Sequence, residues 1–431
     1  MDNRKLKMDN CQLPTVNSQL KNGYKQTEVG VIPNDWELNK LGEIAEVATG
    51  NTPPTKDQSN YGSDYFFVSP ADLGKGKYIT NTEKKLSKKG FKISRKFPAN
   101  SILFTCIGST IGKAGIASKG LTSNQQINAI FPDDSFCTDY LFYALNLLSP
   151  RIKSLAGEQA VPIINKSEFE ETLIPFPPTK AEQTAIAAAL SDVDVLISSL
   201  EKLIAKKRNI KQGAMQELLT GKKRLPGFSG KWEVKKLGEI GITYGGLSGK
   251  SKQDFENGEY PYIPFLNIMN NPVIDTSYFD YVNIGSDEKQ NEALQGDLFF
   301  NGSSETPEEV GMCSVLQEDI PNLYLNSFCF GFRLHKVLKT DGLYLSYYFR
   351  SNEGRKLFYS LAQGATRYNL SKNNFLKMEI SYPNPEEQTA IAQILSDMDA
   401  EIEQLEQKLA KYRMIKQGMM QELLTGKTRL V

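Results

Sequence analysis

The sequence predicts an α+β protein in which two globular heads are separated by two long helices with pseudo-twofold symmetry. First, residues 182–225 and 387–430 are near-copies of each other, identical at 30 of 44 positions at a constant offset of 205 (387 − 182). Second, each copy follows a less similar stretch of roughly 150 residues, long enough for a domain. Third, these stretches mix strand and helix patterns. A repeated scaffold that carries two different heads indicates contact with two different targets.

Each copy has the pattern of a helix with one narrow apolar stripe. The apolar positions step by 4, 3, 4, 3, 4, which is typical of a coiled-coil seam. They are Ile186, Leu190, Val193, Ile197, Leu200 and Ile204, matched by Ile391, Leu395, Met398, Ile402, Leu405 and Leu409. Gly221 and Gly426 suit left-handed caps at the ends. Residues 182–219 as helix extend about 55–57 Å at ~1.5 Å per residue. Because a whole head joins the copies, we expect an antiparallel coiled coil.

The heads read as mixed strands and helices. We expect strands near residues 101–107, 125–131, 297–300 and 328–334, and helices near 140–149 and 342–351. The predicted organisation is an N-terminal arm at 1–22, head one at 23–178, a first spacer helix at 179–221, head two at 222–384 and a second spacer helix at 385–431.

The two heads begin alike, with Trp36 before Leu41 and Trp232 before Leu237, at an offset of 196 (232 − 36). A spacer helix precedes head two, but none precedes head one. If the chain is a cut circle, residues 29–33 should lie near the C-terminus.

Composition excludes several classes of protein. No run approaches the 18 apolar residues of a membrane span, and the first ten residues, MDNRKLKMDN, are polar. The five cysteines include no CxxC pair, which fits a reducing compartment. We therefore expect a cytoplasmic protein without membrane contact.

No catalytic set is apparent. His335 is the only histidine, and no Cys/His cluster has zinc-ligand spacing. Residues 245–251 resemble a phosphate loop, but Tyr244 stands where that motif requires glycine, so a glycine-rich binding loop is the better interpretation. The chain is predicted to be non-catalytic, with no metal or cofactor of its own.

At this point the residues resemble a known family. The segment TEVGVIPNDWELNKLGEI at 27–44, the two heads, and the duplicated EQTAIA…LSDxD…KQGxMQELLTGKxRL resemble the specificity subunit of type I restriction–modification systems. The resemblance covers about residues 24–430. The duplicated helix is its specific part, because heads vary within that family.

The resemblance implies a DNA-reading subunit. Each head would read one half of a bipartite, asymmetric site on double-stranded DNA, and the coiled coil would set the gap. Two modification subunits would dock and methylate adenine at N6 with S-adenosylmethionine, and two restriction subunits would add ATP- and Mg-dependent translocation and cleavage. Two alternatives are a coiled-coil interaction adaptor without DNA readout and a fragment of a fused DNA-modifying enzyme.

Candidate DNA contacts in head one are basic or amide side chains. Residues 84–96 carry seven basic residues and no acid, which suits either phosphate contact or a solvated loop. The candidates are Lys92, Arg95, Lys96, Ser109, Thr110, Lys113, Asn124, Gln125 and Gln126. Amides can bind adenine with two hydrogen bonds, although turn capping would use the same groups.

Head two is acidic, with 18 acidic and 12 basic residues between 243 and 386. Its candidates lie in polar turns and in one loop that carries an arginine, which could instead pair with a carboxylate of the head. They are Asn301, Ser303, Ser304, Asn326, Arg367, Tyr368 and Asn369.

Identity between the copies extends past what a two-helix seam requires, into IKQGxMQELLTGK. Identical surfaces would suit two copies of one partner. The predicted partner-binding residues are Lys211, Gln212, Met215, Leu218, Lys416, Gln417, Met420 and Leu423.

Overall fold

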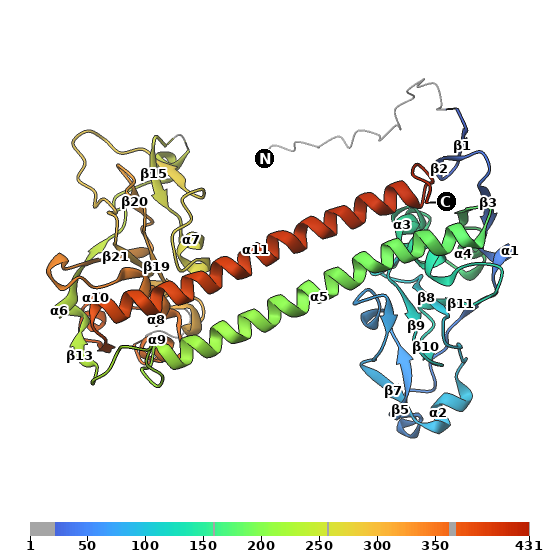
Figure 1. Cartoon of the computed structure of the whole chain (residues 1–431), viewed down its shortest axis with the longest axis horizontal. Helices are drawn as coiled ribbons and strands as arrows, with labels where there is room; N and C mark the ends of the chain where they lie inside the picture. The colour runs from blue at the N-terminus through green and yellow to red at the C-terminus, as the bar shows by residue number, and fades with distance from the viewer. Residues whose placement is uncertain (1–21, 158–159, 257, 362–367, 431) are drawn as a thin grey trace. The chain divides into compact units, whose positions relative to one another are not determined.

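The computed structural model describes residues 22–157, 160–256, 258–361 and 368–430, so the N-terminal arm and Arg367 lie outside the described residues. The chain divides into two compact units: unit 1 comprises residues 1–199 with 409–431, and unit 2 comprises residues 200–408. Each unit contains one head and parts of both long helices, α5 (Lys180–Leu218) and α11 (Pro385–Leu423) (Figure 1). The predicted α+β fold with two heads and a coiled coil is confirmed.

Unit 1 is built around a five-stranded sheet in the order β4-β11-β8-β9-β6, with a three-stranded sheet in the order β10-β5-β7. Two-stranded ribbons β1-β2 and β12-β3 complete it. Its strands are β1 (Tyr24–Thr27), β2 (Gly30–Pro33), β3 (Glu37–Lys40), β4 (Val47–Thr49), β5 (Tyr61–Val68), β6 (Tyr78–Ile79), β7 (Lys84–Leu86), β8 (Ile102–Thr105), β9 (Ala114–Ala117), β10 (Thr122–Ser123), β11 (Ile127–Ile130) and β12 (Leu173–Phe176). Its shorter helices are α1 (Leu41–Ile44), α2 (Lys88–Ile93), α3 (Thr138–Ser154) and α4 (Lys166–Glu170).

The core of unit 1 forms where α3, the sheet and the coiled coil meet. Strands β8, β9 and β11 are buried at every position, so they read as apolar runs without alternation. Phe104 of β8 stacks on Phe169 of α4 with ring centroids 4.9 Å apart. The same apolar cluster includes Ile186 and Leu190 of α5. Head one and this end of the coil therefore share one core.

Unit 2 repeats this plan with different strands. Its main sheet has the order β14-β21-β17-β19, beside a three-stranded sheet β16-β15-β20 and ribbons β13-β23 and β18-β22. The strands are β13 (Glu233–Lys236), β14 (Gly241–Gly245), β15 (Tyr260–Ile263), β16 (Asp280–Val282), β17 (Leu298–Asn301), β18 (Ser303–Ser304), β19 (Cys313–Val315), β20 (Tyr324–Leu325), β21 (Cys329–Leu334), β22 (Tyr368–Asn369) and β23 (Glu379–Tyr382). The shorter helices are α6 (Leu237–Ile240), α7 (Phe265–Asn270), α8 (Gly342–Arg350), α9 (Asn352–Tyr359) and α10 (Lys372–Leu376).

Aromatic rings dominate the core of unit 2. Phe300 of β17 stacks on Phe330 of β21 at 5.3 Å, and Phe375 of α10 packs edge-on against Phe300 at 4.9 Å. Ile391 and Leu395 of α11 belong to the same cluster. The coil is thus anchored in a head core within each unit.

The predicted seam residues of α5 and α11 are shielded from solvent. Eight of the twelve residues are buried, and the other four are half-buried. The helices are antiparallel. Residues with higher numbers on α5 pair with residues that have lower numbers on α11. In unit 1, Asp194 pairs with Lys416; in unit 2, Lys211 pairs with Asp399.

Helix α5 is long and apolar enough to cross a membrane by length and composition, with an 18-residue window of mean hydropathy 1.2. Several of its apolar side chains are buried inside the protein. Ile186, Ala187 and Leu190 are buried in the core of unit 1, and Leu200 and Ile204 are buried on the seam. Packing within the protein accounts for these positions of the apolar stretch, and 28% of the 18-residue window is buried.

An arginine–glutamate pair closes each end of the coil. In unit 2, Arg224 donates to both carboxylate oxygens of Glu387 at 2.5 and 2.7 Å, and Trp232 Nε1 donates to the same carboxylate at 3.0 Å. In unit 1, Arg429 donates to both oxygens of Glu182, one of them at 2.7 Å. Each arginine is the second-to-last residue of one copy of the repeat and binds the first residue of the other copy. We call these pairs the end latches.

The start of head one lies beside the end of the chain within unit 1, as predicted for residues 29–33. The Tyr24 hydroxyl donates to the carbonyl of Gly426 at 3.1 Å, and Arg429 binds Asp35 at 3.1 Å. Gly426 has φ of +69°, and a Cβ there would clash with the ring of Pro33. Both the left-handed backbone and the close approach therefore require glycine.

The end latches should contribute measurably to stability. Glu182 is 2% exposed, and Glu182→Gln keeps its shape but removes the charge that faces Arg429. We expect a loss of about 2 kcal/mol in the free energy of unfolding, the usual contribution of a hydrogen bond to a charged group. Urea denaturation of the full chain measures it, and Glu387→Gln should shift stability in the same direction.

The matched control is Glu83→Gln. Glu83 pairs with Lys75 at 3.3 Å, but the two side chains are 63% and 65% exposed. Exposed pairs contribute under about 1 kcal/mol. Equal losses for Glu182→Gln and Glu83→Gln would contradict the role of the latches.

Candidate nucleic-acid interface

Two polar loops meet at one edge of head one. Residues 50–52 follow β4, and residues 123–126 connect β10 to β11. The Thr52 hydroxyl donates to Gln125 Oε1 at 2.6 Å. A Cβ on Gly50 would clash with Ser123 Oγ and with the Asn124 carbonyl oxygen, so only glycine permits this approach. We call these two segments the head-one loop pair.

Arg95 joins the basic segment to the loop pair. Its backbone N–H donates to Asn51 Oδ1 at 2.5 Å, and its Nη1 donates to the Thr49 carbonyl at 2.6 Å. Arg95 is exposed despite these bonds. One arginine thus holds the loop in place and still presents a positive charge at its edge.

The rest of the basic segment lies on β7, on α2 and just after α2. The side chain of Ser87 accepts from Gly90 N–H and caps α2. Lys89 hydrogen-bonds to Asp57 at 2.7 Å, which with the bonds from Ser59 lowers the pKa of that carboxyl to about 2. Lys92 is exposed. The Lys96 ammonium is also exposed and lies 5.6 Å from the centre of the Phe91 ring.

The turn at residues 108–113 lies next to the loop pair. A Cβ on Gly108 would be 3.8 Å from Gln126 Nε2. Ser109 and Lys113 are exposed, and Thr110 is half-buried. The structure therefore brings the predicted residues of head one into neighbouring segments.

Asn124 and Gln126 partly satisfy each other. Asn124 Nδ2 donates to Gln126 Oε1 at 2.8 Å, and Gln126 N–H donates to Asn124 Oδ1 at 3.1 Å. Gln125 is the exposed amide of this loop. Two of the three amides therefore make the turn-capping bonds that were the alternative to base contact. Base contact by all three remains a prediction.

Three candidates in head two are buried and serve the fold. Asn301 is 0% exposed; its amide donates to the Glu309 carbonyl at 2.8 Å and its Oδ1 accepts from Met312 N–H at 2.6 Å. Ser303 and Ser304 pair with β22 as strand β18. The Asn301 side chain holds a turn, and Ser304 Oγ donates to Glu309 at 2.7 Å, so contact of these side chains with DNA would require the turn to open.

The remaining head-two candidates are more accessible. Asn326 is half-buried and accepts from Phe328 N–H at 2.9 Å, and Ser327 is exposed. Tyr368 is half-buried and Asn369 is exposed on β22. Arg367 lies outside the described residues.

Head two contains the same close loop approach as head one. A Cβ on Gly246 would clash with the Asn326 carbonyl oxygen, as a Cβ on Gly50 would clash with that of Asn124. Gly50 and Gly246 differ by 196, the offset between the starts of the heads. We call residues 245–250 with 326–328 the head-two loop pair.

The sequence analysis did not identify one of the two segments of the head-one loop pair, residues 50–52. Asn51 and Thr52 were not predicted, although the stretch GNTPPT at 50–55 is rich in turn residues. These residues could have been identified from Gly50 and Gly246, which stand at equal distances from the start of each head. In the head-two loop, Lys250 bonds to Glu288 at 2.5 Å and its side chain is 6% exposed, so it is a structural lysine.

Most of the predicted partner-binding residues make contacts inside the protein. Lys211 and Lys416 pair with Asp399 and Asp194, which also accept from Tyr347 and Tyr143. Leu218 and Leu423 are buried, and Met215 and Met420 pack against the two cores. Gln212 and Gln417 are exposed. Internal packing therefore accounts for much of the identity attributed to a partner, and partner binding stays a prediction.

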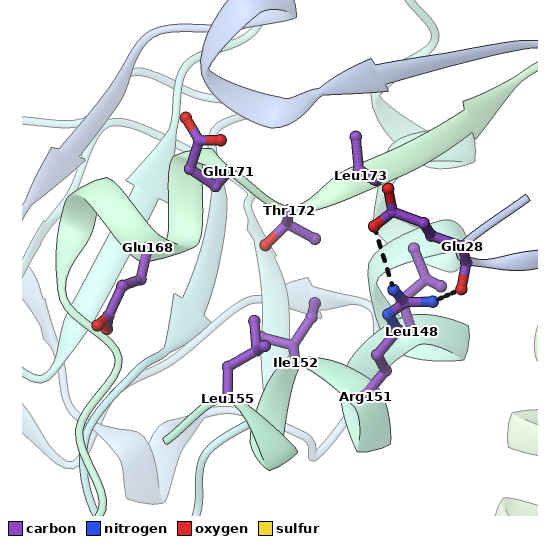
Figure 2. Close-up of a pocket in the computed structure, with 9 residues that line it drawn as sticks. All are labelled: Glu28, Leu148, Arg151, Ile152, Leu155, Glu168, Glu171, Thr172 and Leu173. Carbon is purple, nitrogen blue, oxygen red and sulfur yellow. Dashed lines mark hydrogen bonds and ion pairs between the residues drawn. The ribbon is translucent and has the colours of Figure 1, made fainter. Parts of the chain in front are cut away.

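Unit 1 also contains a pocket of about 350 Å³ away from the loop pair. Figure 2 shows the Arg151 side chain pointing toward Glu28. Arg151 Nη2 lies 3.9 Å from Glu28 Oε2. The apolar part of the lining includes Leu148 and Leu155. None of the predicted DNA-binding residues lines this pocket. It was not part of the predicted interface.

Comparison with known proteins gives a consistent match across the chain. The family model described as type I restriction modification DNA specificity domain matches residues 33–211 and 229–411. The specificity subunit of the type I restriction enzyme MjaIX from Methanocaldococcus jannaschii is 30% identical over 286 residues, which are 60% of this chain and 64% of that protein. The chain thus matches just under two thirds of that relative.

Two further proteins match over nearly their whole length. The specificity subunit of the type I restriction enzyme MjaVIII from the same organism is 27% identical over 414 residues, or 93% of this chain and 94% of that protein. The crystal structure of a type I restriction–modification S subunit from M. genitalium has a TM-score of 0.57 at 17% identity, covering 94% of this chain and 97% of that chain. At this identity the structural match shows a shared fold.

The predicted phosphate contacts can be tested by salt dependence. Replacing Lys92 with alanine removes one exposed charge without breaking a described ion pair. If it contacts phosphate, the slope of log affinity against log salt should become less negative by about 0.9. Fluorescence anisotropy of a labelled duplex measures the slope. Lys75→Ala is the control on the same head, and an unchanged slope for Lys92→Ala would remove it from the interface.

Proposed function

The chain belongs to the family of type I restriction–modification DNA specificity proteins, and from this membership we propose that it is the subunit that selects the DNA sequence of such a complex. Head one and head two each read one half of a bipartite, asymmetric site on double-stranded DNA. The single observation that carries this proposal is the recurrence of one loop pair on two heads with different side chains.

The loop pairs suit base reading on physical grounds. In each, a glycine lets two polar segments approach within van der Waals contact. Head one presents Thr52, Gln125 and Arg95 at this edge. Amide and guanidinium groups can form two hydrogen bonds with a base edge in the major groove, and lysines on α2 would hold phosphates. Head two presents Asn326 and Ser327 instead.

The coiled coil would set the gap between half-sites. Each long helix has 39 residues, or about 58 Å at ~1.5 Å per residue. B-DNA advances about 34–36 Å per turn. A rigid spacer of this length suits recognition of two separated stretches of one duplex.

We propose that the chemistry belongs to partner subunits. Two modification subunits would bring S-adenosylmethionine and transfer its methyl group to adenine N6, and two restriction subunits would bring ATP and Mg. This chain's residues would bind and orient the DNA. A cytoplasmic location follows from that role. Among the described residues there is no group of three or more His, Cys, Asp or Glu side chains that could hold a metal ion.

The docking face for modification subunits is better placed on residues that the fold leaves open. Ile210 and Ile415 are identical in the two copies and are 46% and 38% exposed. One turn later, Gly213 and Gly418 face open space: apart from the neighbouring residues and backbone of the helix itself, no atom lies within 4 Å of the point where a Cβ would be. Glycine inside an exposed helix costs about 0.5–1 kcal/mol relative to alanine. Its presence in both copies suits close approach by another helix, and Gln212 and Gln417 adjoin it.

The adaptor alternative is not favoured. A coiled-coil adaptor would need no pair of heads with matching loop geometry, and the family match includes both heads.

Exchange of one head tests modular reading. Replacing residues 45–150 with those of another family member should change one half-site of the methylated sequence and leave the other half unchanged. The variant and the natural chain are expressed with their modification subunit, and adenine methylation is mapped across the genome. A change in both half-sites, or one continuous short motif from the natural chain, would sink the proposal.

A bulky side chain on the docking face tests partner binding. Gly213→Leu has free space within the chain, so it should leave stability equal or higher. If a partner helix packs there, affinity for the modification subunit should fall about tenfold or more, measured by calorimetric titration. Gly418→Leu is the twin at the second copy, and Gly120→Leu on head one is the control. Normal binding by both helix variants would move the docking face elsewhere.

A further inference from the structure

A groove in unit 2 lies between the coiled coil and head two. Its volume is about 870 Å³, and it is bounded by α5, α11 and the residues that follow α7. Tyr347, Ser396, Asp399 and Pro272 are among the residues that line it. We call it the unit 2 groove.

The equivalent place in unit 1 is occupied by a lysine of the chain itself. Lys77 Nζ donates to Ser191 Oγ at 2.7 Å and lies 2.8 Å from Asp139 Oδ2. It also lies 5.1 Å from the centre of the Tyr143 ring. The Lys77 side chain is only 10% exposed. Unit 1 therefore shows that this position, between a head and the coil, accepts an ammonium group.

Strand register establishes that Pro272 takes the place of Lys77. In unit 1, β8 pairs with β9 through Ile102 and Ile116, and Ile116 N–H donates to the Lys77 carbonyl at 2.8 Å. In unit 2, β17 pairs with β19 through Leu298 and Val315, and Val315 N–H donates to the Pro272 carbonyl at 3.1 Å. The same backbone bond is made, but proline replaces the lysine side chain.

The surroundings of the lysine are kept in part in unit 2, where Leu343 stands in the place of Asp139, at the offset of 204 that relates Tyr143 to Tyr347 (347 − 143). The Tyr347 hydroxyl donates a hydrogen bond to Asp399 at 2.7 Å, as the Tyr143 hydroxyl does to Asp194 at 2.6 Å in unit 1. Ser396 is the repeat counterpart of Ser191. Unit 2 thus retains the hydroxyls and the ring around the position, while its own residue there carries no charge.

The unit 2 groove also has an excess of negative charge. Its lining carries four acids and two bases, a net charge of −2 (2 − 4). Arg208 pairs with Glu406, and Lys211 pairs with Asp399. Asp275 accepts hydrogen bonds from Ser277, and Glu403 accepts one from Gln407 at 3.2 Å, neither of which brings a positive charge.

We infer that the unit 2 groove accepts a lysine or arginine side chain of the modification subunit, in the position that Lys77 holds in unit 1. This inference rests on the proposed function, because it takes the modification subunit as the partner. The charge argues for a basic protein side chain and against DNA, since the carboxylates would repel phosphate. The ring of Tyr347 adds a cation–π contact for the incoming group.

The test fills the groove from within. Pro272→Lys places a lysine at the counterpart of Lys77, while the carbonyl bond to Val315 is kept. Calorimetric titration of the purified modification subunit into the full chain should show one binding step weakened about tenfold. Pro272→Ala, which leaves the groove open, should bind like the natural chain. Thermal unfolding of each variant reports whether the fold is intact.

A second variant tests the charge of the groove without the lysine added at position 272. Asp275→Asn with Glu403→Gln neutralises the two carboxylates without changing the volume, and should weaken the same step. Normal binding by both the lysine variant and the neutral variant would overturn the inference. So would reduced DNA affinity of Pro272→Lys in the absence of the modification subunit, since the groove would then serve nucleic acid. If the natural chain fails to bind the modification subunit, the proposed function itself fails.

Discussion

The structure depends on an exchange of charged partners between the two copies of one helix. Lys211 of the first copy binds Asp399 of the second, and Lys416 of the second binds Asp194 of the first. The end latches repeat the exchange, since Arg224 binds Glu387 and Arg429 binds Glu182. Carboxylates that are 0% and 2% exposed, Glu387 and Glu182, are expensive to bury without a cation. These pairs therefore oppose any shift of register along the apolar seam.

This exchange explains why the repeat is so strict. A coiled-coil seam tolerates substitution among apolar residues, as the pairs Val193 with Met398 and Ile204 with Leu409 show. The residues of the four cross-coil pairs named above are instead identical in both copies. Each unit thus has a complete joint made of one end of each helix, and each joint holds its own head through Tyr143 or Tyr347. The heads can then differ in their polar loops without disturbing the scaffold.

The heads show how much of a binding surface a single sequence predicts. The basic segment at 84–96 and the polar turn at 123–126 were found from composition, and the structure places them beside each other through Arg95 and Asn51. Asn301 was selected for the same chemistry, yet its amide is consumed by a turn. A polar side chain in a turn has the same signature whether it serves the backbone or a ligand. Only the location of its hydrogen-bond partners separates the two.

The sequence by itself determined the duplication, the helices, their seam, their antiparallel pairing and the α+β heads, because helical periodicity and the identity of two segments can both be read directly from the order of the residues. It also indicated that the first and last segments meet, as the Tyr24–Gly426 bond bears out. Only the tertiary structure decided which identical residues serve the fold and which remain open, and that Lys77 fills a position whose counterpart in unit 2 is Pro272. Those outcomes depend on contacts between residues more than 100 positions apart, such as Lys77 with Ser191, which no local pattern records.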